Sequence, residues 1–349
     1  MKSAPVHAAM RELAPDADLR LVHTEQHYDE SMSAVFFDEL GLPRPDESLG
    51  VGSGTHGEQT ARALVAVERS LTNWRPDLVV VAGDVNSTLA AALAAVKLHL
   101  PVAHIEAGLR SFDASMPEEH NRRLTDHLSV VLLAHSDSAL ENLAREGIAP
   151  ERSHLVGNTM IDSLLANVDR ARAARPWERF GLAEGGYGLV TLHRQALFET
   201  RGRLAAAADG LIGLAQEVEV LFPLHPRTAT RLEETGDAQR LRDAGVHLAP
   251  PLGYLDFLGL QAGALFVLTD SGGVQEETSA LGVRCFTLRD STERPVTVEL
   301  GTNTVLGADP AAIALVPALL AESRAPREIP LWDGAAGGRA AEVLLRELA

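Results

Sequence analysis

Short apolar runs alternate along the chain with longer, alanine-rich segments whose apolar positions repeat at helical spacing. Few polar positions interrupt these runs, which is typical of strands buried on both faces of a parallel sheet. The helical segments between them supply the crossovers that parallel strands require. The pattern predicts ten strands, at residues 19–24, 77–84, 101–108, 129–136, 153–158, 187–194, 218–225, 246–251, 264–273 and 283–289.

The alternation is interrupted between residues 174 and 188, where Pro, Trp and a Gly pair occur together. This composition predicts an interdomain linker. A chain of 349 residues is also long for a single compact core. We therefore predict two doubly wound α/β domains that face a cleft. Their expected bounds are 1–172 and 173–334, followed by a C-terminal helix at 335–349.

The overall charge and cysteine content limit the kinds of partner and the compartment. A net charge of -17 without a basic stripe argues against binding nucleic acid. The single cysteine, Cys285, excludes an intramolecular disulfide and fits a reducing compartment. No apolar run reaches the length of a membrane span, and the start lacks a signal-peptide pattern. These features predict a cytoplasmic protein that does not bind membranes.

Ionisable or glycine-rich groups follow five of the predicted strands. Each alone is as easily explained as a helix cap or a satisfied polar group, but five together favour an active site beyond the carboxyl ends of the strands. After the second strand, one residue of Asn86-Ser87-Thr88 is expected to cap the next helix. The five groups are Asp84, Glu106, His193-Arg194, His225 with Pro226-Arg227, and residues 269–273.

The segment TDSGGVQEE (269–277) is the clearest candidate for ligand binding. Ser271, Gly272 and Gly273 would let backbone amides approach an anion at a helix N-terminus. One turn later, Glu277 could accept hydrogen bonds from ribose hydroxyls. A capped strand-to-helix turn with an acidic first turn explains the same pattern equally well. Two arginines downstream, Arg289 and Arg294, could hold a phosphate, although a single arginine is usually only solvated.

The charged stretch HIEAGLRSFDASMPEEHNR (104–122) divides into a strand exit and a helix start. Pro117 suits the first turn of a helix in which Glu118 and Arg122, and likewise Glu119 and Arg123, share a face. A salt-bridged surface helix would explain those four residues. Glu106 cannot join that helix by spacing. Several carboxylates with a histidine would suit general acid–base chemistry, and spacing alone does not assign the roles.

Taken in order, the motifs resemble those of the non-hydrolysing UDP-N-acetylglucosamine 2-epimerases. The resemblance runs from Lys2 almost to the C-terminus. It rests on GDVNSTLAA (83–91), HIEAGLRSFDASMPEEHNRRLTDHL (104–128), GNTMID (157–162), TLHR (191–194), LHPRT (224–228), DSGGVQEE (270–277), RDSTERP (289–295) and LWDG (331–334).

The resemblance implies two Rossmann-like domains of the glycosyltransferase-B type, with the C-terminal helix crossing back to the N-terminal domain. That first domain would be the sugar and catalytic side, and the second the UDP-binding side. The implied reaction interconverts UDP-N-acetylglucosamine and UDP-N-acetylmannosamine by removing the C2 proton, eliminating UDP and adding it back. No NAD or metal is implied. A homodimer is implied, and in bacterial members a second UDP-N-acetylglucosamine acts as an activator.

Carried over position by position, the resemblance assigns catalytic roles to Asp84, Glu106, Glu118 and His193. The residues that match UDP, uracil, phosphate or activator contacts are Lys2, Arg194, His225, Leu252, Phe257, Ser271, Gly272, Gly273, Glu277 and Arg294.

The chain departs from the family pattern in three places. Lys2-Ser3-Ala4-Pro5 matches a piece that follows the first strand, so that strand and its phosphate-binding arginine are expected to be missing. Glu25 replaces a family glycine, and Ala196-Leu197 replaces Glu-Asn, which puts activator control in doubt. Three alternatives remain open: a hydrolysing epimerase, a UDP-sugar glycosyltransferase and a catalytically silent nucleotide-sugar-binding relative.

Overall fold

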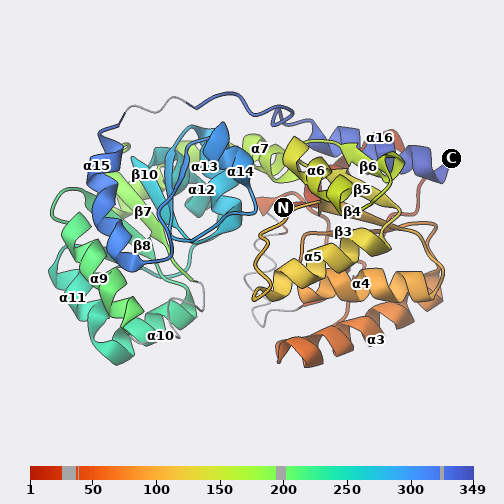
Figure 1. Cartoon of the computed structure of the whole chain (residues 1–349), viewed down its shortest axis with the longest axis horizontal. Helices are drawn as coiled ribbons and strands as arrows, with labels where there is room; N and C mark the ends of the chain where they lie inside the picture. Colours follow the sequence, from red (N-terminus) through yellow and green to blue (C-terminus); the bar gives the residue numbers. More distant parts are fainter. Residues whose placement is uncertain (26–36, 38, 194–201, 323–325) are drawn as a thin grey trace. The chain divides into compact units, whose positions relative to one another are not determined.

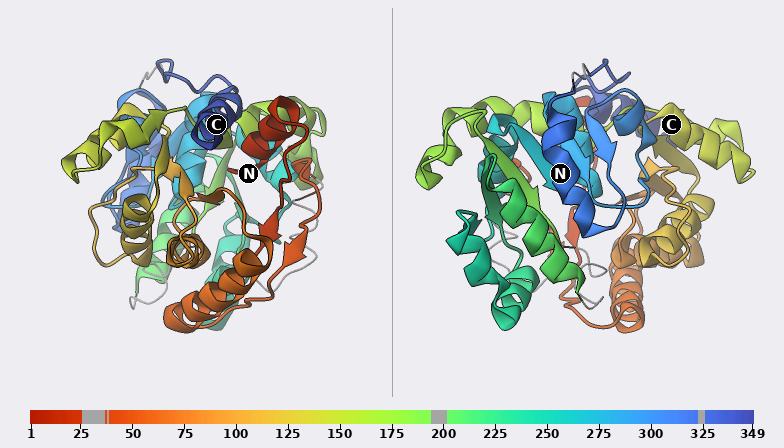
Figure 2. Two further views of the ribbon diagram at one scale, coloured as in Figure 1. Left: turned by 90° about the vertical axis from the view of Figure 1, so that its right-hand side faces the viewer. Right: turned by 60° about the vertical axis from the view of Figure 1, so that its left-hand side comes forward.

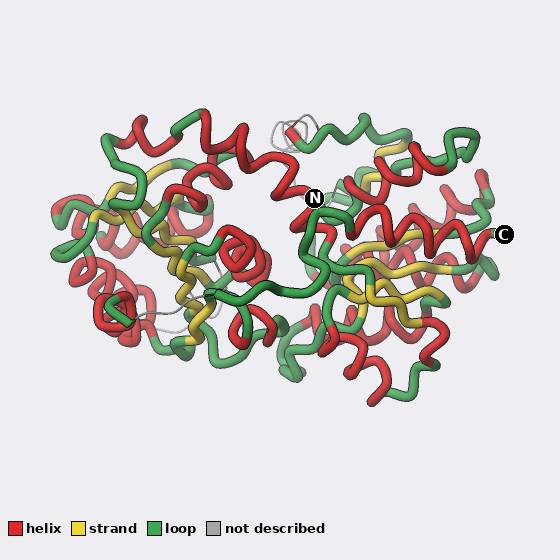
Figure 3. Tube along the Cα trace, turned by 90° about the horizontal axis from the view of Figure 1, so that it is seen from above, coloured by secondary structure: helices red, strands yellow, loops and turns green. Residues whose placement is uncertain are grey.

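A computed structural model describes residues 1–25, 37, 39–193, 202–322 and 326–349. The chain forms two compact units (Figure 1). The first unit contains Met1–Ser163 and Pro330–Ala349, and the second contains Leu164–Ile329. In each unit parallel strands lie between helices, as Figure 3 shows by the yellow and red segments.

The main sheet of the first unit has four parallel strands in chain order. They are β3 (Val79–Ala82), β4 (Val102–Ala107), β5 (Val131–Ala134) and β6 (Ser153–Leu155). A separate parallel pair is formed by β1 (Val22–His23) and β2 (Glu47–Ser48). The helices of this unit are α1 (Ala4–Leu13), α3 (His56–Trp74), α4 (Asn86–Lys97), α5 (Pro117–Leu128), α6 (Asp137–Arg145), η1 (Pro150–Arg152) and α16 (Ala336–Leu348).

Alternate residues of the first sheet face different helices, as the two-residue period of a strand requires. Ala103 and Ile105 of β4 pack in one cluster with Met10 of α1 and Leu344 of α16. Helix α1 therefore lies beside α16, although the two are at opposite ends of the sequence (Figure 2). Val102 of β4 packs instead in the cluster formed with α3 and α4.

The sheet of the second unit has six parallel strands in the order β12-β11-β10-β7-β8-β9. The chain starts in the middle at β7, moves outward to β9, and returns to β10 on the other side of β7. This doubly wound order has its switch point between β7 and β10. The strands are β7 (Tyr187–Thr191), β8 (Glu219–Pro223), β9 (His247–Ala249), β10 (Phe266–Thr269), β11 (Arg284–Thr287) and β12 (Asn303–Val305).

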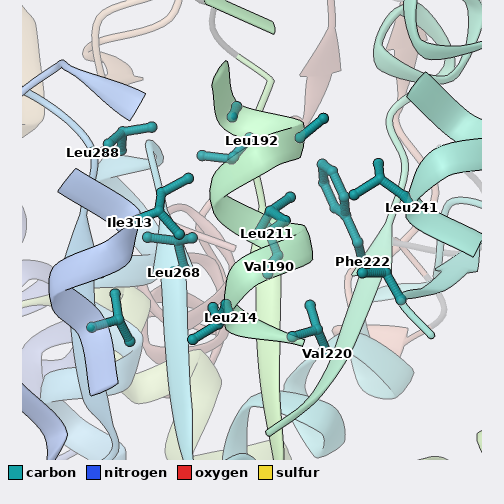
Figure 4. Packing of buried hydrophobic residues seen from close by; sticks show 14 of the residues in the cluster. Val190, Leu192, Leu211, Leu214, Val220, Phe222, Leu241, Leu268, Leu288 and Ile313 are labelled. Carbon is teal, nitrogen blue, oxygen red and sulfur yellow. The ribbon is translucent and has the colours of Figure 1, made fainter. Parts of the chain in front are cut away.

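Helices cover this second sheet on both faces. Figure 4 shows Val190 and Leu268 packed against Leu211 of α9 and Ile313 of η3. Strand residues of opposite parity, such as Val267, pack in a second cluster. The helices of this unit are η2 (Pro176–Phe180), α9 (Arg203–Leu214), α10 (Pro226–Thr235), α11 (Asp237–Asp243), α12 (Tyr254–Gly263), α13 (Gly272–Leu281), α14 (Pro295–Glu299), η3 (Pro310–Leu315) and α15 (Val316–Leu320), and α7 (Thr159–Ala173) crosses the boundary between the units.

The segment 174–188 is not a linker, so that prediction is wrong. It lies inside the second unit, where Trp177 of η2 is buried in the same cluster as Tyr187 of β7. Proline and glycine here shape a packed turn, and the tryptophan anchors it to the core. The boundary falls at Ser163, inside α7, whereas the sequence analysis placed it after residue 172.

All ten predicted strands are present, each shorter than its apolar run. Two strands were not predicted, β2 and β12. The two residues of β2 are polar and exposed, so no apolar run marks them. Within the part of the chain that the structure describes, no helix is both long and apolar enough to cross a membrane.

Candidate active site

Glu106 occupies an unusual backbone position at the end of β4. Its φ is 69°, and the pairing of β4 with β5 shifts register between Ile105 and Ala107. A left-handed conformation is unfavourable for a residue with a side chain, and such strain concentrates at functional sites. The residue is buried, and its carboxylate forms an ion pair with the Lys2 ammonium. The bulge thus turns a buried carboxylate out of the regular alternation of the strand.

Gly83 and Asp84 follow β3, next to the Glu106 carboxylate. Gly83 has a φ of 71°, and a Cβ at this position would lie 2.8 Å from Lys2 Nζ and 3.5 Å from Glu106 Oε2. Glycine is therefore required both for the turn and for the space beside the ion pair. The predicted site residues Lys2, Glu106 and Asp84 are thereby brought to one edge of the first sheet. Lys2 pairs with the Glu106 carboxylate in this structure, whereas the resemblance implies a lysine near the phosphates.

The predicted cap of helix α4 is wrong. Val85 is the N-cap residue, and no side chain caps the helix. Asn86 is already helical, and its side-chain amide donates to Gln59 Oε1 at 2.8 Å. The Thr88 hydroxyl donates back to the Ala82 carbonyl at 2.9 Å. These polar groups hold the strand exit against neighbouring elements, which sequence spacing could not reveal.

The predicted salt-bridged helix is confirmed in part: Glu119 and Arg122 pair within α5, but the expected pairs of Glu118 with Arg122 and of Glu119 with Arg123 are not the ones observed. Arg122 binds across to Asp84, with Nη2 at 2.5 Å from Oδ2, and its Nη1 is 2.8 Å from Glu119 Oε2. Arg123 pairs with Glu146 at 3.1 Å. The spacing correctly placed these residues on a helix but not their partners. Arg122 therefore fixes the Asp84 carboxylate from a neighbouring helix.

Glu119, in the first turn of α5, holds the loop between β4 and α5. It is 3% exposed, and its Oε2 accepts hydrogen bonds from Ser111 N and Ser111 Oγ, both at 2.9 Å. Its Oε1 accepts from Phe112 N at 3.2 Å. Glu118 is half-buried in the first turn of α5, and no partner for its carboxylate is found among the described residues. The two neighbouring glutamates thus differ: one holds the loop, and the other keeps its carboxylate available.

The sequence analysis did not identify a buried charged network in the first unit, which contacts the Gly83 carbonyl next to Asp84. His104 Nδ1 is 2.7 Å from Asp126 Oδ1, and His104 Nε2 is 2.8 Å from the Gly83 carbonyl oxygen. Arg110 Nη1 donates to Asp126 Oδ2 at 2.7 Å. Burial alone would raise the pKa of Asp126, but His104 and Arg110 hold that pKa below its ordinary value. The network connects the interior of the first unit to the turn that carries Asp84.

In the second unit, His193 follows β7 and meets Asp270, which follows β10. The backbone N–H of His193 donates to Asp270 Oδ2 at 2.9 Å, and the ring Nδ1 is 3.0 Å from Oδ1. Asp270 is 2% exposed, whereas the His193 side chain is 44% exposed. The pair lies at the switch point of the sheet, where doubly wound folds bind ligands. Asp270 was inside a predicted motif but was not singled out.

Ser271, Gly272 and Gly273 begin helix α13, as the sequence indicated. The Ser271 amide donates to Thr269 Oγ1 at 2.9 Å. A Cβ on Gly272 would lie only 2.3 Å from Arg294 Nη1, so the guanidinium packs directly on this glycine. Arg294 is in turn fixed by an ion pair with Glu276 at 2.9 Å. A buried arginine beside a helix N-terminus provides two of the elements that bind a phosphate.

Gly272→Ala is expected to weaken binding of UDP, the ligand that the resemblance implies, at least tenfold, because the methyl group would displace Arg294 from the helix N-terminus. Titration calorimetry with UDP would measure the loss. Gly213→Ala in α9 is the matched control, since a Cβ there meets nothing within 4 Å. Equal affinity of the two variants would contradict the assignment of Arg294 to phosphate.

Glu277 is buried in α13, and its Oε2 accepts a hydrogen bond from Gln261 Nε2 at 2.7 Å. Burial raises the pKa of this carboxyl to about 7; the Gln261 hydrogen bond opposes the rise and the neighbouring Glu276 charge adds to it. A carboxyl group that is partly protonated near neutrality can both donate and accept hydrogen bonds. That capacity suits recognition of ribose hydroxyls.

Glu277→Gln is expected to change the free energy of unfolding more favourably at pH 8 than at pH 5. The raised pKa means that the folded state holds a proton which the unfolded state releases above its value of 4.5. Stability therefore falls as pH rises from 4.5 to about 7, by roughly 3 kcal/mol at most, and glutamine removes this loss. Unfolding free energies at both pH values test this. The exposed Glu217→Gln should show no such difference.

The remaining predicted residues lie in three different settings. Leu252 and Phe257 are half-buried and pack against the second cluster of the second unit. His225 is the N-cap of α10, where its Nδ1 accepts from Arg227 N at 3.3 Å. Arg194 lies outside the described residues, as do Ala196 and Leu197. Glu25, which replaces a family glycine, has a φ of 54° and so keeps the left-handed backbone that glycine would favour.

Comparison with known proteins decides the family. The profile described as UDP-N-acetylglucosamine 2-epimerase matches residues 10–345. The chain belongs to this family. It is 41% identical over 350 residues to the UDP-N-acetylglucosamine 2-epimerase of Methanocaldococcus jannaschii, covering 99% of this chain and 95% of the relative. The resemblance carried by the ordered motifs is confirmed, and the chain is similar to enzymes throughout its length.

Two further relatives bear on substrate and fold. The UDP-2,3-diacetamido-2,3-dideoxy-D-glucuronate 2-epimerase of Pseudomonas aeruginosa is 43% identical over 292 residues, covering 82% of this chain and 80% of the relative. The crystal structure of the M. jannaschii enzyme in complex with UDP-GlcNAc and UDP has a TM-score of 0.91 at 42% identity, covering 99% of this chain and 96% of that one. The predicted fold class, two Rossmann-like domains of the glycosyltransferase-B type, is confirmed.

Proposed function

We propose that this chain interconverts UDP-N-acetylglucosamine and UDP-N-acetylmannosamine without net hydrolysis. The observation that carries the proposal is the geometry of Glu106, a buried carboxylate in a left-handed bulge beside Lys2 and the Gly83-Asp84 turn. Strained positions persist where the surrounding structure holds them, and they concentrate at reacting groups. Family membership supplies the substrate class, a UDP-linked 2-acetamido sugar.

The proposed reaction needs groups that remove and return a proton at C2. A carboxylate of the first unit takes the C2 proton while the bond between C1 and the UDP oxygen breaks, which leaves a C1–C2 double bond. UDP then adds back at C1, and a second acid delivers a proton to the other face of C2. We assign these steps to Asp84, Glu106 and Glu118, without dividing the acid and base roles among them.

The second unit is proposed to hold UDP. Ser271, Gly272 and Gly273 would present the N-terminus of α13 to the diphosphate, with Arg294 as the fixed positive charge. Glu277 would bind the ribose. Leu252 and Phe257 are assigned to the uracil, and His193 to the leaving phosphate oxygen. No step in this scheme requires a redox cofactor or a metal ion.

A second substrate is favoured by one observation. The relative from P. aeruginosa, named for a diacetamido-glucuronate substrate, has the same 43% identity to this chain as a relative named for UDP-N-acetylglucosamine, over 82% rather than 91% of the chain. That substrate carries a carboxylate and a second acetamido group in addition to the shared UDP and C2 acetamido groups. Both nucleotide sugars therefore belong in the same assay.

The test is incubation with each nucleotide sugar in deuterated water, followed by NMR at C2. Deuterium at C2 together with accumulation of the 2-epimer of the intact nucleotide sugar supports the proposal. Free sugar plus UDP would indicate a hydrolysing epimerase, and transfer to an added acceptor would indicate a glycosyltransferase. Binding without exchange would indicate a silent relative.

We also propose a homodimer and a second UDP-N-acetylglucosamine that acts as an activator, held by His225 and Arg194. These assignments follow from the resemblance, and the replacement at Ala196-Leu197 weighs against the activator. Sedimentation would give the oligomeric state. Initial rates in the direction from UDP-N-acetylmannosamine, with and without added UDP-N-acetylglucosamine, would show whether activation occurs.

A further inference from the structure

Asp270 and His193 form a paired carboxylate and imidazole at the centre of the second sheet. Strands β7 and β10 are direct neighbours, with Thr191 opposite Thr269, so their exits lie side by side. The carboxylate of Asp270 contacts His193 at two points, the backbone N–H at 2.9 Å and the ring Nδ1 at 3.0 Å. The same buried carboxylate therefore holds the backbone of the histidine by a hydrogen bond and faces its ring Nδ1 at ion-pair distance.

We propose that Asp270 is a positioning residue that holds His193 with its proton on Nδ1 and its Nε2 directed to the substrate. The inference rests on the proposed function only for the identity of that substrate. An unprotonated Nδ1 would set its lone pair against the carboxylate oxygen 3.0 Å away, so the ring nitrogen that faces Asp270 carries the hydrogen. The other nitrogen is then the one that exchanges a proton or a hydrogen bond with the reacting group.

The exposure of the two residues supports this division of roles. Asp270 is 2% exposed and cannot itself meet a ligand from solvent, whereas the His193 side chain is 44% exposed. A buried carboxylate that orients a more exposed imidazole is the arrangement that sets the tautomer in catalytic triads. A role limited to folding would be to tie the exits of β7 and β10 through the backbone contact. The folding role requires only the backbone contact, whereas the positioning role also requires that Asp270 set the tautomer of the ring.

Asp270→Asn separates the two roles because asparagine keeps the size of the side chain and can still accept the backbone N–H. Its amide would face Nδ1 with a donor or a weaker acceptor and would favour the other tautomer. We expect kcat for C2 exchange to fall about 10²–10⁴-fold. The affinity for UDP should stay within about threefold, because Gly272 and Arg294 are untouched. In the His193→Ala background, Asp270→Asn should have no further effect on kcat.

The ¹⁵N signals of His193 in the wild-type protein provide a test that depends neither on turnover nor on the folding of a variant. In the wild-type protein the neutral ring should show hydrogen on Nδ1, and in Asp270→Asn the hydrogen should move to Nε2. Hydrogen on Nε2 in the wild-type neutral ring would overturn the proposal. So would a kcat of Asp270→Asn within threefold of wild type, or equal further losses in the His193→Ala background. A wild-type protein that shows the Nδ1 tautomer but no C2 exchange would instead contradict the proposed function alone.

Discussion

Glu106→Gln is expected to reduce exchange of the C2 proton by about 10²–10⁴-fold while the fold is retained. The amide keeps the shape of the side chain, so the bulge at the end of β4 can form, but it can neither take nor hold the C2 proton. It also removes the negative charge that pairs with Lys2. The rate of deuterium incorporation at C2 and the thermal unfolding curve together measure the two effects.

Two other glutamate variants serve as controls for this experiment. Glu68→Gln, on the exposed surface of α3, should change neither rate nor stability. Glu119→Gln should mainly lower stability, by about 1–3 kcal/mol, because Glu119 accepts hydrogen bonds from the loop at Ser111 and Phe112. If Glu119→Gln were as damaging to exchange as Glu106→Gln with stability unchanged, the division between catalytic Glu106 and structural Glu119 would be wrong.

The strands could be predicted because both faces of each parallel sheet are covered. Residues such as Ile105 and Val267 are buried whichever way they point, so the strand reads as a continuous apolar run. The same reasoning fails for β2, whose Glu47 and Ser48 pair with β1 while exposed to solvent. It also fails for the segment around Trp177, where turn residues predict a linker although the tryptophan is buried.

Candidate site residues could be predicted where a strand exit fixes their place, but their partners could not. The sequence places Asp84 and Glu106 at neighbouring strand ends, and the structure brings both to one sheet edge. Helix spacing predicted Glu118 as the partner of Arg122, and the observed partners are Asp84 and Glu119. Spacing reports which side chains share a face, but the element across from that face is set by tertiary packing.

Two groups escaped sequence analysis because their neighbours are distant in the chain. Asp270 meets a histidine that lies 77 positions away, on another strand. His104 lies two residues before Glu106, and its burial between Asp126 and the Gly83 carbonyl depends on three separate elements. A polar residue inside an apolar strand, as for His104, or directly after one, as for Asp270, was the available signal. It indicates a buried, partnered group, but the pattern does not name the partner.

Asp126→Asn is expected to lower the free energy of unfolding of the first unit by about 3–5 kcal/mol. The carboxylate lies between His104 and Arg110, and it also accepts the Gly108 N–H at 3.1 Å. An amide would keep its size but lose the charge, and would bring an N–H group towards donors. A buried cation left without its counterion is among the costliest defects of a protein interior. Hydrogen exchange of the β4 and β5 amides would report the loss in this unit directly.

The pH dependence and a matched variant distinguish this network from an ordinary ion pair. Because the pKa of Asp126 is lowered on folding, its stabilising contribution is present above the unfolded value of 3.8 and is lost as pH falls through the folded value. The difference between wild type and Asp126→Asn should thus be constant near neutrality and shrink in acid. Asp333→Asn breaks an exposed pair with Arg339, also at 2.7 Å, and should cost about 1 kcal/mol or less. Equal losses for the two variants would show that burial does not give the Asp126 network its strength.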